Sequence, residues 1–190
     1  MRYKNIDGQI DSNHRFLQTA ELFHVSREVN FYVGHQFCRY CAQKSNSNTL
    51  CSLNISGSTI RYSPSIDMLE KEFKCFGVNP EQVCFEITET VADRDYKQAI
   101  HFMSLLKSRL GCQLSLDDIG IGSSNLANLS KVNVDYLKID GSFINDILFD
   151  PYSELVVKFI TSAAKLYGRK TIAEYVENTQ QFEKMRELSV

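Results

Sequence analysis

The stretch Leu114-Ser115-Leu116-Asp117-Asp118 is a short apolar run that ends on two adjacent carboxylates. Four other apolar runs also end on a polar residue of a kind that binds metal ions or phosphate. They are Leu50-Cys51-Ser52-Leu53-Asn54, Val83-Cys84-Phe85-Glu86, Tyr136-Leu137-Lys138 and Thr171-Ile172-Ala173-Glu174. Successive runs are separated by about the length of one strand plus one helix, which is typical of repeated βα units. The pattern predicts an α/β fold, a (β/α)8 barrel of the TIM type whose parallel strands deliver these polar residues to one rim.

The segments between these runs carry apolar residues at helical spacing, so an order of elements can be predicted. We expect a strand end and a turn over residues 1–12, helices over 13–24 and 27–44, a strand over 50–55, a helix over 64–77, a strand over 82–88, a helix over 94–110, strands over 112–117 and 135–139, helices over 142–147 and 151–167, a strand over 170–174 and a helix over 178–187. A complete barrel has eight strands and about 250 residues. We therefore expect one domain over residues 1–190, an incomplete barrel whose first and last strands are missing.

The amino-acid composition argues against several classes of protein. Hydrophobic residues make up 43% of the 190 residues, so the chain can bury a core and disorder is not expected. A net charge of −2 argues against binding to a nucleic-acid polymer, which a basic face would favour. No apolar run approaches the about 20 residues of a membrane span, so we expect no membrane contact from this segment.

The six cysteines predict packing rather than a metal centre or disulfides. Cys38 and Cys41 form a single C-x-x-C with no second pair at zinc-ligand spacing, and their helical spacing favours burial over metal binding. Cys51, Cys84 and Cys112 lie in or beside apolar strands, where a thiol behaves as a small hydrophobic group. Unpaired thiols of this kind predict a cytoplasmic location.

The adjacent carboxylates of Asp117 and Asp118 are the strongest local signal. If the strand ends before them, both can turn to the rim and serve two cations, as in phosphoester hydrolysis. The alternative is a solvated pair that caps the next loop, since Asp is a common turn residue.

Glu86, Asn54 and Glu174 stand among apolar strand residues, where an unpartnered polar side chain is costly. Oxygen ligands of this kind suit Mg²⁺ or Mn²⁺, although a buried hydrogen bond or ion pair would also explain each residue alone. Lys138, between Leu137 and Ile139, would hold a phosphate oxygen or orient a hydroxide. Its alternative role is a structural ion pair with Asp117, Asp118 or Glu174.

Motifs in these runs resemble those of the EAL-domain family, the bacterial cyclic di-GMP phosphodiesterases. The matching segments occur in the family's order and cover nearly the whole chain. They are Leu53-Asn54-Ile55-Ser56, Phe85-Glu86-Ile87-Thr88-Glu89, Leu116-Asp117-Asp118, Leu137-Lys138-Ile139-Asp140-Gly141-Ser142-Phe143-Ile144 and Ile172-Ala173-Glu174-Tyr175-Val176-Glu177. An unrelated metal-dependent barrel enzyme fits the polar residues but not this order.

The resemblance implies two-metal hydrolysis of cyclic di-GMP to linear pGpG in second-messenger signalling, with Mg²⁺ or Mn²⁺ as cofactor. It implies that the metal ligands are Asn54, Glu86, Asp117, Asp118 and Glu174. It further implies that Lys138 positions the attacking water and that Glu89 braces the loop after the Asp pair. Arg2 matches an arginine that contacts substrate phosphate. Cyclic di-GMP is the expected partner, and a homodimer is a further option.

The chain departs from the family pattern at its ends and in one loop. The family's namesake glutamate would stand a few residues before Arg2, where the chain begins at Met1, and a late glutamine would lie beyond Val190. The common pattern has Phe, Thr, Tyr and Ser at the positions of Ile119, Ile121, Ser123 and Asn125. We therefore expect the chain as given to be weakly active or inactive. The alternative function is a degenerate EAL domain that binds a protein partner or cyclic di-GMP without hydrolysis.

Overall fold

The structure, a computed structural model, describes residues 3–4, 8–11, 16, 19–20, 22–23, 25–44, 49–94, 96–120 and 132–190. The chain divides into two compact units. One unit contains residues 1–49 and 55–79, and the other contains residues 50–54 and 80–190. The expectation of a single domain over residues 1–190 stays a prediction. Among the described residues, no helix has both the length and the apolar character that crossing a membrane requires.

The first unit consists mainly of packed helices. β1 (Tyr3–Lys4) pairs antiparallel with β2 (Ile10–Asp11), in the region where the sequence predicts a strand and a turn. α2 (Ser26–Gln43) packs against α3 (Gly57–Arg61) and α4 (Ser65–Phe76). α4 ends at Gly77, whose φ of +64° suits glycine, as the sequence predicts. The helix predicted over 13–24 falls mostly outside the described residues, and α3 is an element that the sequence did not predict.

The C-x-x-C motif lies inside α2. Both Cys38 and Cys41 are buried there, and all six cysteines of the chain are free thiols. Burial raises the pKa of the Cys38 thiol to about 12, with a smaller contribution from the charge of Glu72. The packing interpretation of this motif is therefore confirmed.

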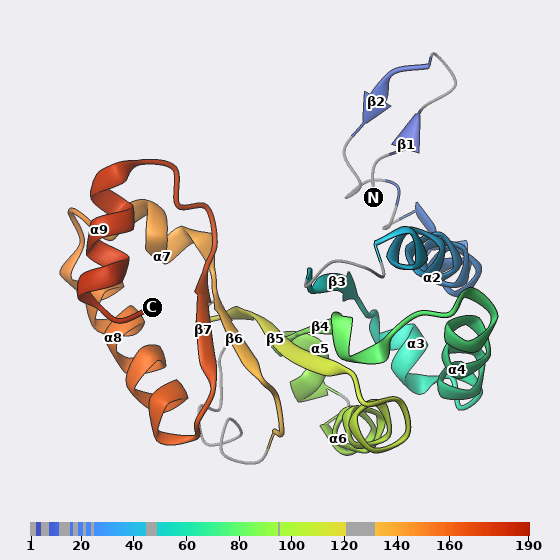
Figure 1. Cartoon of the computed structure of the whole chain (residues 1–190). Coiled ribbons are helices and arrows are strands. Elements are labelled where there is room, and N and C mark those ends of the chain that lie inside the picture. Colours follow the sequence, from blue (N-terminus) through green and yellow to red (C-terminus); the bar gives the residue numbers. More distant parts are fainter. Residues whose placement is uncertain are drawn as a thin grey trace. The chain divides into compact units, whose positions relative to one another are not determined.

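The second unit is built on a sheet of five parallel strands. They are β3 (Cys51–Asn54), β4 (Val83–Thr88), β5 (Gln113–Ile119), β6 (Tyr136–Ile139) and β7 (Lys170–Ala173). Their spatial order β3-β4-β5-β6-β7 is the order in the sequence, so each strand pairs with the next one along the chain (Figure 1). This is the strand order of a βα barrel, and all five carboxyl ends meet at one edge of the sheet.

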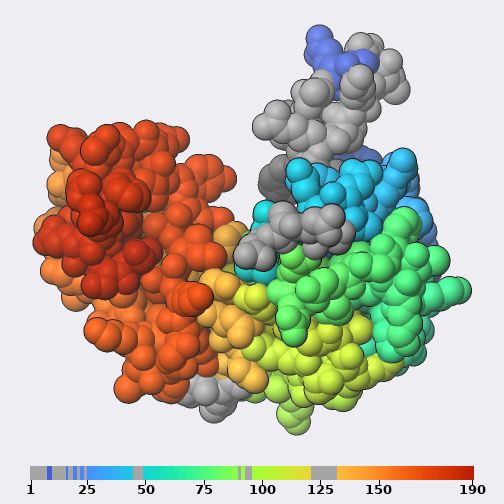
Figure 2. All heavy atoms as spheres, viewed as in Figure 1, coloured from blue at the N-terminus to red at the C-terminus, as the bar shows by residue number. Residues whose placement is uncertain are grey.

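Helices connect the strands and supply the rest of the core of this unit. They are η1 (Pro80–Gln82), α5 (Glu89–Arg94), α6 (Tyr96–Leu105), the π-helix η2 (Leu106–Leu110), α7 (Gly141–Asp146), α8 (Pro151–Leu166) and α9 (Thr179–Glu187). α8 packs against β6 and β7, and the residues of α7, α8 and α9 form one continuous orange-to-red body (Figure 2). The strand residues Phe85, Leu114 and Leu137 are fully buried, because both faces of a parallel sheet are covered.

Side-chain caps fix the starts of the later helices. Asp150 accepts hydrogen bonds from the backbone N–H groups of Tyr152 and Ser153, and Pro151 stands at the first position of α8. Asp140 caps α7 by accepting from Ser142 N–H at 2.8 Å. This cap sets the path of the chain directly after Lys138, the polar residue of β6.

Candidate functional site

Lys138 stands at the centre of a group of carboxylates that lie in β4 and β5 and directly after β7. Its Nζ lies 2.7 Å from Glu174 Oε1, 2.8 Å from Asp117 Oδ1 and 3.2 Å from Glu86 Oε2. The side chains of Lys138, Glu86 and Asp117 are each only 10–12% exposed. Residues separated by up to 88 positions in the sequence (Glu86 and Glu174) are thus joined through one ammonium group, at the carboxyl ends of β4, β5, β6 and β7.

A bulge in β5 brings Asp117 and Asp118 to the same site. Leu116 pairs with Leu137 and Ile119 with Ile139, so two residues of β5 lie opposite the single residue Lys138. The strand therefore continues to Ile119, and the prediction that it ends at residue 117 is wrong. Asp118 has a φ of +58°, and this left-handed backbone conformation breaks the alternation of side chains along the strand.

Three carboxylates form the part of the site that best fits a cation. Asp117, Asp118 and Glu174 each offer one oxygen, and these oxygens all lie within 4.8 Å of one another. Burial raises the pKa of Asp118, and the negative charges of Asp117, Asp140 and Glu174 raise it further. The cluster thus holds more negative charge than its surroundings neutralise.

Among the described residues, Lys138 pairs directly with three of these acidic side chains. Burial by itself lowers the pKa of a lysine, but hydrogen bonds to Asp117 and Glu174, with the charges of Asp117 and Glu86, outweigh burial. The pKa of Lys138 is therefore raised above its ordinary value, and the ammonium stays charged. One lysine thus stands among four acidic side chains, those of Glu86, Asp117, Asp118 and Glu174.

Asn54 and Ser115 extend the polar face of the sheet beside Glu86. In the strand register Asn54 pairs with Glu86, and Glu86 pairs with Ser115. Residues paired in this way project from the same face. The Ser115 hydroxyl oxygen is buried and has no hydrogen-bond partner among the described residues, which is an unusual state for a buried polar atom.

Glu89, another candidate residue, contacts the chain directly after β5. Glu89, the first residue of α5, is buried, and its Oε2 accepts a hydrogen bond from Gly120 N–H at 3.4 Å. This contact links α5 to the residue that follows β5. Arg2 lies outside the described residues, as do Ile121, Ser123 and Asn125, so their predicted roles stay predictions. Ile119 is described and fully buried.

Sequence reasoning assigned no role to Asp140. Its carboxylate caps α7, and its charge contributes to the raised pKa of Asp118. Its position two residues after Lys138 would have placed it on the same strand face, which is a signal that the sequence did contain.

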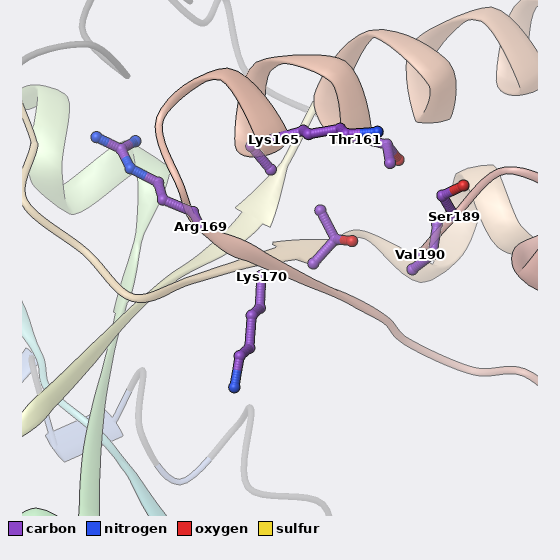
Figure 3. Close-up of a pocket in the computed structure, with 8 residues that line it drawn as sticks. Thr161, Lys165, Arg169, Lys170, Ser189 and Val190 are labelled. Atoms are coloured by element: carbon purple, nitrogen blue, oxygen red, sulfur yellow. The ribbon is translucent and has the colours of Figure 1, made fainter.

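The second unit also has a hollow of about 440 Å³ (Figure 3). It is lined by the end of α8, the start of β7 and the last two residues, Ser189 and Val190. The side chains of Arg169 and Lys170 extend away from Ser189 and Val190 in the close-up. The Arg169 guanidinium instead donates to the carbonyl of Val132 and lies 5.1 Å from the centre of the Tyr167 ring. None of the candidate site residues lines this hollow.

The residues present fit a divalent cation. The donors are carboxylate oxygens with an amide nearby, and they are buried or half-buried. Among the described residues, the Ser115 hydroxyl beside Glu86 has no hydrogen-bond partner. Hard cations such as Mg²⁺ and Mn²⁺ prefer oxygen donors, and a buried excess of negative charge favours binding a cation. The role of each residue as a ligand stays a prediction.

Fold and site together define an α/β protein of the TIM-like barrel type with an acidic site at the carboxyl ends of its strands. The family model for the EAL domain matches residues 1–190, so this chain belongs to the EAL domain family. The sequence-based assignment of fold and family is thereby confirmed.

Known proteins similar to this chain include cyclic di-GMP phosphodiesterases. The chain is 27% identical over 192 residues to cyclic di-GMP phosphodiesterase PdeB of Shewanella oneidensis and 30% identical over 185 residues to PdeF of Escherichia coli. These matches cover 100% and 95% of this chain but only 22% and 24% of the two relatives. The chain thus spans about a quarter of the length of the curated relatives that it matches.

Solved structures share the fold of this chain. A structure described as the PaMucR phosphodiesterase in complex with c-di-GMP has a TM-score of 0.91 and 25% identity, covering 98% of this chain and 76% of its own. The EAL domain of FimX from Pseudomonas aeruginosa, bound to c-di-GMP, has a TM-score of 0.90 at 21% identity and covers 100% of this chain and 76% of its own. The FimX likeness concerns the fold alone.

Proposed function

We propose that this chain carries the acidic site of a cyclic di-GMP-specific phosphodiesterase, which hydrolyses cyclic di-GMP to linear pGpG with Mg²⁺ or Mn²⁺. The observation that carries the proposal is the convergence of Glu86, Asp117 and Glu174 on Lys138, within 3.2 Å. These residues come from four separate motifs of the EAL family, and the relatives with phosphodiesterase names support the substrate.

Each side chain has a role in this proposal. Asn54, Glu86, Asp117, Asp118 and Glu174 would hold the cations. When bound, the cations supply Lewis-acid chemistry, which polarises the phosphoryl group and makes water more acidic. Lys138 stays protonated, so it acts as a hydrogen-bond donor that orients the attacking water and not as a base. Glu89 holds Gly120 and thereby the chain after Asp118.

A second candidate function is binding of cyclic di-GMP or a protein partner without hydrolysis. The observation that favours it is that Lys138 already pairs with three of the four carboxylates, so part of the site is neutralised from within. A bound nucleotide would then contact the same rim, but no water would be activated there.

A turnover assay separates the two functions. The purified protein is incubated with cyclic di-GMP and Mg²⁺ or Mn²⁺, and pGpG is measured by chromatography. Asp117→Asn serves as the matched variant, because it removes one charge and keeps the size of the side chain. Metal-dependent turnover that the variant loses supports hydrolysis. Binding of cyclic di-GMP with no turnover by the unaltered protein supports the second function and contradicts the first.

Three companion proposals concern partners and location. The substrate, cyclic di-GMP, is the partner that we infer, and a homodimer is a further option that sedimentation would test. The six free thiols favour the cytoplasm as the location. The bacterial second-messenger role follows only if the substrate assignment holds.

A further inference from the structure

Tyr175 directly follows Glu174 and has an unusual backbone conformation. Its φ is +53°, and Asp118 (+58°) and Ser189 (+61°) are the other described residues besides glycine with positive φ. Asp tolerates this left-handed region, but a bulky side chain there costs roughly 1–2 kcal/mol. Two of the three strained residues thus belong to the rim that carries the carboxylates. Strain of this kind is concentrated at functional sites.

The strand pairing and a glycine together hold the tyrosine in place. Ala173, the last residue of β7, pairs with Ile139, and Glu174 N–H still donates to Ile139 C=O at 3.3 Å. The backbone is therefore bonded to β6 up to the residue before Tyr175. The Tyr175 ring then lies against Gly141, the first residue of α7. A Cβ atom on Gly141 would stand 2.2 Å from Tyr175 Cδ2. The ring therefore occupies the space that any other residue at position 141 would need.

This packing covers only part of the ring. The Tyr175 residue is 68% exposed, and its neighbour Val176 is 37% exposed. A tyrosine whose purpose is core packing would be largely buried, as the strand aromatic Phe85 is. Here one side of the ring lies against the Gly141 backbone, and most of the residue is open to solvent. An aromatic ring fixed in this way is a surface on which a planar base can stack.

We propose that Tyr175 stacks on a guanine base of the nucleotide whose phosphate lies at Lys138 and the carboxylates. The inference rests on the proposed function, because the nucleotide class comes from it. A base lies to the side of its phosphate, so a ring one residue beyond Glu174 suits this contact. Stacking on an aromatic side chain contributes about 1–3 kcal/mol per base, and it tolerates any base because each has a π face. Gly141 is then the residue that positions the ring.

The absence of tryptophan from the 190-residue chain gives a direct optical test. Tyr175→Trp introduces a single indole at the proposed stacking position. Tyr152→Trp is the matched control, since Tyr152 on α8 is 64% exposed and its ring lies 6.4 Å from that of Phe143, whereas the Tyr175 ring lies against Gly141. Titration with GMP or cyclic di-GMP should quench the emission of the Tyr175→Trp protein in a saturable way and leave that of the Tyr152→Trp protein unchanged. Equal responses of the two variants would contradict the proposal.

Affinity measurements separate stacking from a purely structural role. Tyr175→Leu keeps apolar bulk but removes the π face, and Tyr175→Phe keeps the ring. We expect Tyr175→Leu to weaken binding of GMP about 5- to 150-fold, with Tyr175→Phe within about twofold of the unaltered protein. Ribose 5-phosphate, which has the phosphate but no base, should bind all three proteins equally. A loss of ribose 5-phosphate binding in Tyr175→Leu would show that the site had been distorted, and would overturn the stacking role.

A double-mutant cycle tests the link to Gly141. Gly141→Ala should displace the ring and weaken GMP binding, and the same change in a Tyr175→Leu background should have little further effect. Additive losses would overturn the positioning role of Gly141.

The outcomes for the inference and for the proposed function can be told apart. Tyrosine-dependent binding of GMP and cyclic di-GMP without turnover supports stacking and contradicts hydrolysis. Turnover of cyclic di-GMP with equal affinities in the unaltered protein, Tyr175→Phe and Tyr175→Leu contradicts stacking alone. Failure of the unaltered protein to bind any nucleotide contradicts both.

Discussion

The Nζ atom of Lys138 lies 2.8 Å from Asp117 Oδ1, across the bulge by which β5 places two residues opposite one residue of β6. Both side chains are about nine-tenths buried. A buried pair of this kind costs desolvation, and it contributes to stability only when the geometry and the remaining partners are good. Lys138 has two more carboxylate partners, Glu86 and Glu174, which supply these further contacts. Replacing Lys138 should therefore lower stability as well as activity.

We expect Lys138→Met to destabilise the protein when no divalent cation is present. The variant leaves Glu86, Asp117 and Glu174 buried without a counter-charge, and breaking a buried pair in this way costs about 3–5 kcal/mol. Added Mg²⁺ or Mn²⁺ should recover part of the loss, because a ligand that binds only the folded state stabilises it. Thermal unfolding with and without each metal measures both effects. If the proposed hydrolysis holds, turnover should fall about 100-fold or more.

Lys158→Met is the matched control for this experiment. Lys158 pairs with Glu154 one turn away on α8, and its side chain is 54% exposed. An exposed pair contributes about 0–1 kcal/mol, so stability and metal response should stay close to those of the unaltered protein. Equal unfolding temperatures for Lys138→Met and Lys158→Met would show that the carboxylates do not depend on Lys138.

A second prediction concerns the strained backbone at Asp118. Asp118→Gly should raise stability by about 0.5–1 kcal/mol, because glycine adopts a φ of +58° without the steric cost. The same change should weaken Mn²⁺ binding, because it removes one of the three clustered oxygens. Thermal unfolding and calorimetric Mn²⁺ titration provide the two measurements.

Ser189→Gly separates these two effects. Ser189 has a similar φ of +61° but lies beside the C-terminus, away from the carboxylates. It should also gain stability, with no change in Mn²⁺ affinity. If Asp118→Gly bound Mn²⁺ as tightly as Ser189→Gly does, Asp118 would not be a ligand.

The repeated strands were predictable from sequence because their signal is local. Each apolar run is short, β-prone and closed by a polar residue, and parallel strands must bring their carboxyl ends to one edge. The predicted strand over 82–88 corresponds to β4 (Val83–Thr88), and the predicted helix over 151–167 to α8 (Pro151–Leu166). Four of these runs end on Glu86, Asp117, Lys138 and Glu174. Their three carboxylates accordingly lie within 3.2 Å of Lys138 Nζ.

The bulge at Asp117 and Asp118 could not be predicted, because it depends on how β5 pairs with β6. Alternation along a strand would place these two side chains on opposite faces. Only the register, with Ile119 opposite Ile139, shows that the strand continues and that one residue is extra. The contact of Tyr175 with Gly141 is likewise non-local, since it joins residues 34 positions apart in the sequence.

A third prediction concerns the pH dependence of stability in the first unit. Burial raises the pKa of the Cys38 thiol to about 12 from the ordinary value of 9.0. In the unfolded chain this thiol ionises near pH 9, whereas in the folded protein it keeps its proton. The unfolded state therefore binds fewer protons above pH 9, and the free energy of unfolding falls as the pH rises from about 9 towards 12.

Urea unfolding at pH 8, 9 and 10 measures this dependence. Cys38→Ala should be less stable at pH 8 because it leaves a cavity, but its stability should fall less steeply between pH 9 and 10. Cys75→Ala is the control, since Cys75 is exposed at the end of α4 and its removal should leave the slope unchanged. If the free energy of unfolding of Cys38→Ala fell as steeply with pH as that of the unaltered protein, the raised pKa of Cys38 would be contradicted.

The last prediction contrasts the two ends of the strands. Asp135 stands just before β6, at the amino end of the sheet, where its Oδ1 lies 2.7 Å from Lys107 Nζ and its Oδ2 accepts from Leu114 N–H at 2.8 Å. In a βα barrel this end serves stability and the carboxyl end serves chemistry. Asp135→Ala removes two charged hydrogen bonds from partly buried groups, so we expect a loss of about 2–3 kcal/mol in the free energy of unfolding.

The same variant should keep the metal site intact, because Asp135 contacts neither Lys138 nor its carboxylates. Urea unfolding and Mn²⁺ titration of Asp135→Ala are compared with those of Asp117→Ala, which alters a carboxylate at the opposite end of β5. We expect unchanged Mn²⁺ affinity at temperatures where Asp135→Ala is folded, and a marked loss of affinity in Asp117→Ala. Lower Mn²⁺ affinity in folded Asp135→Ala would mean that the two ends of the sheet are coupled. The division between a stabilising end and a cation-binding end would then be wrong for this protein.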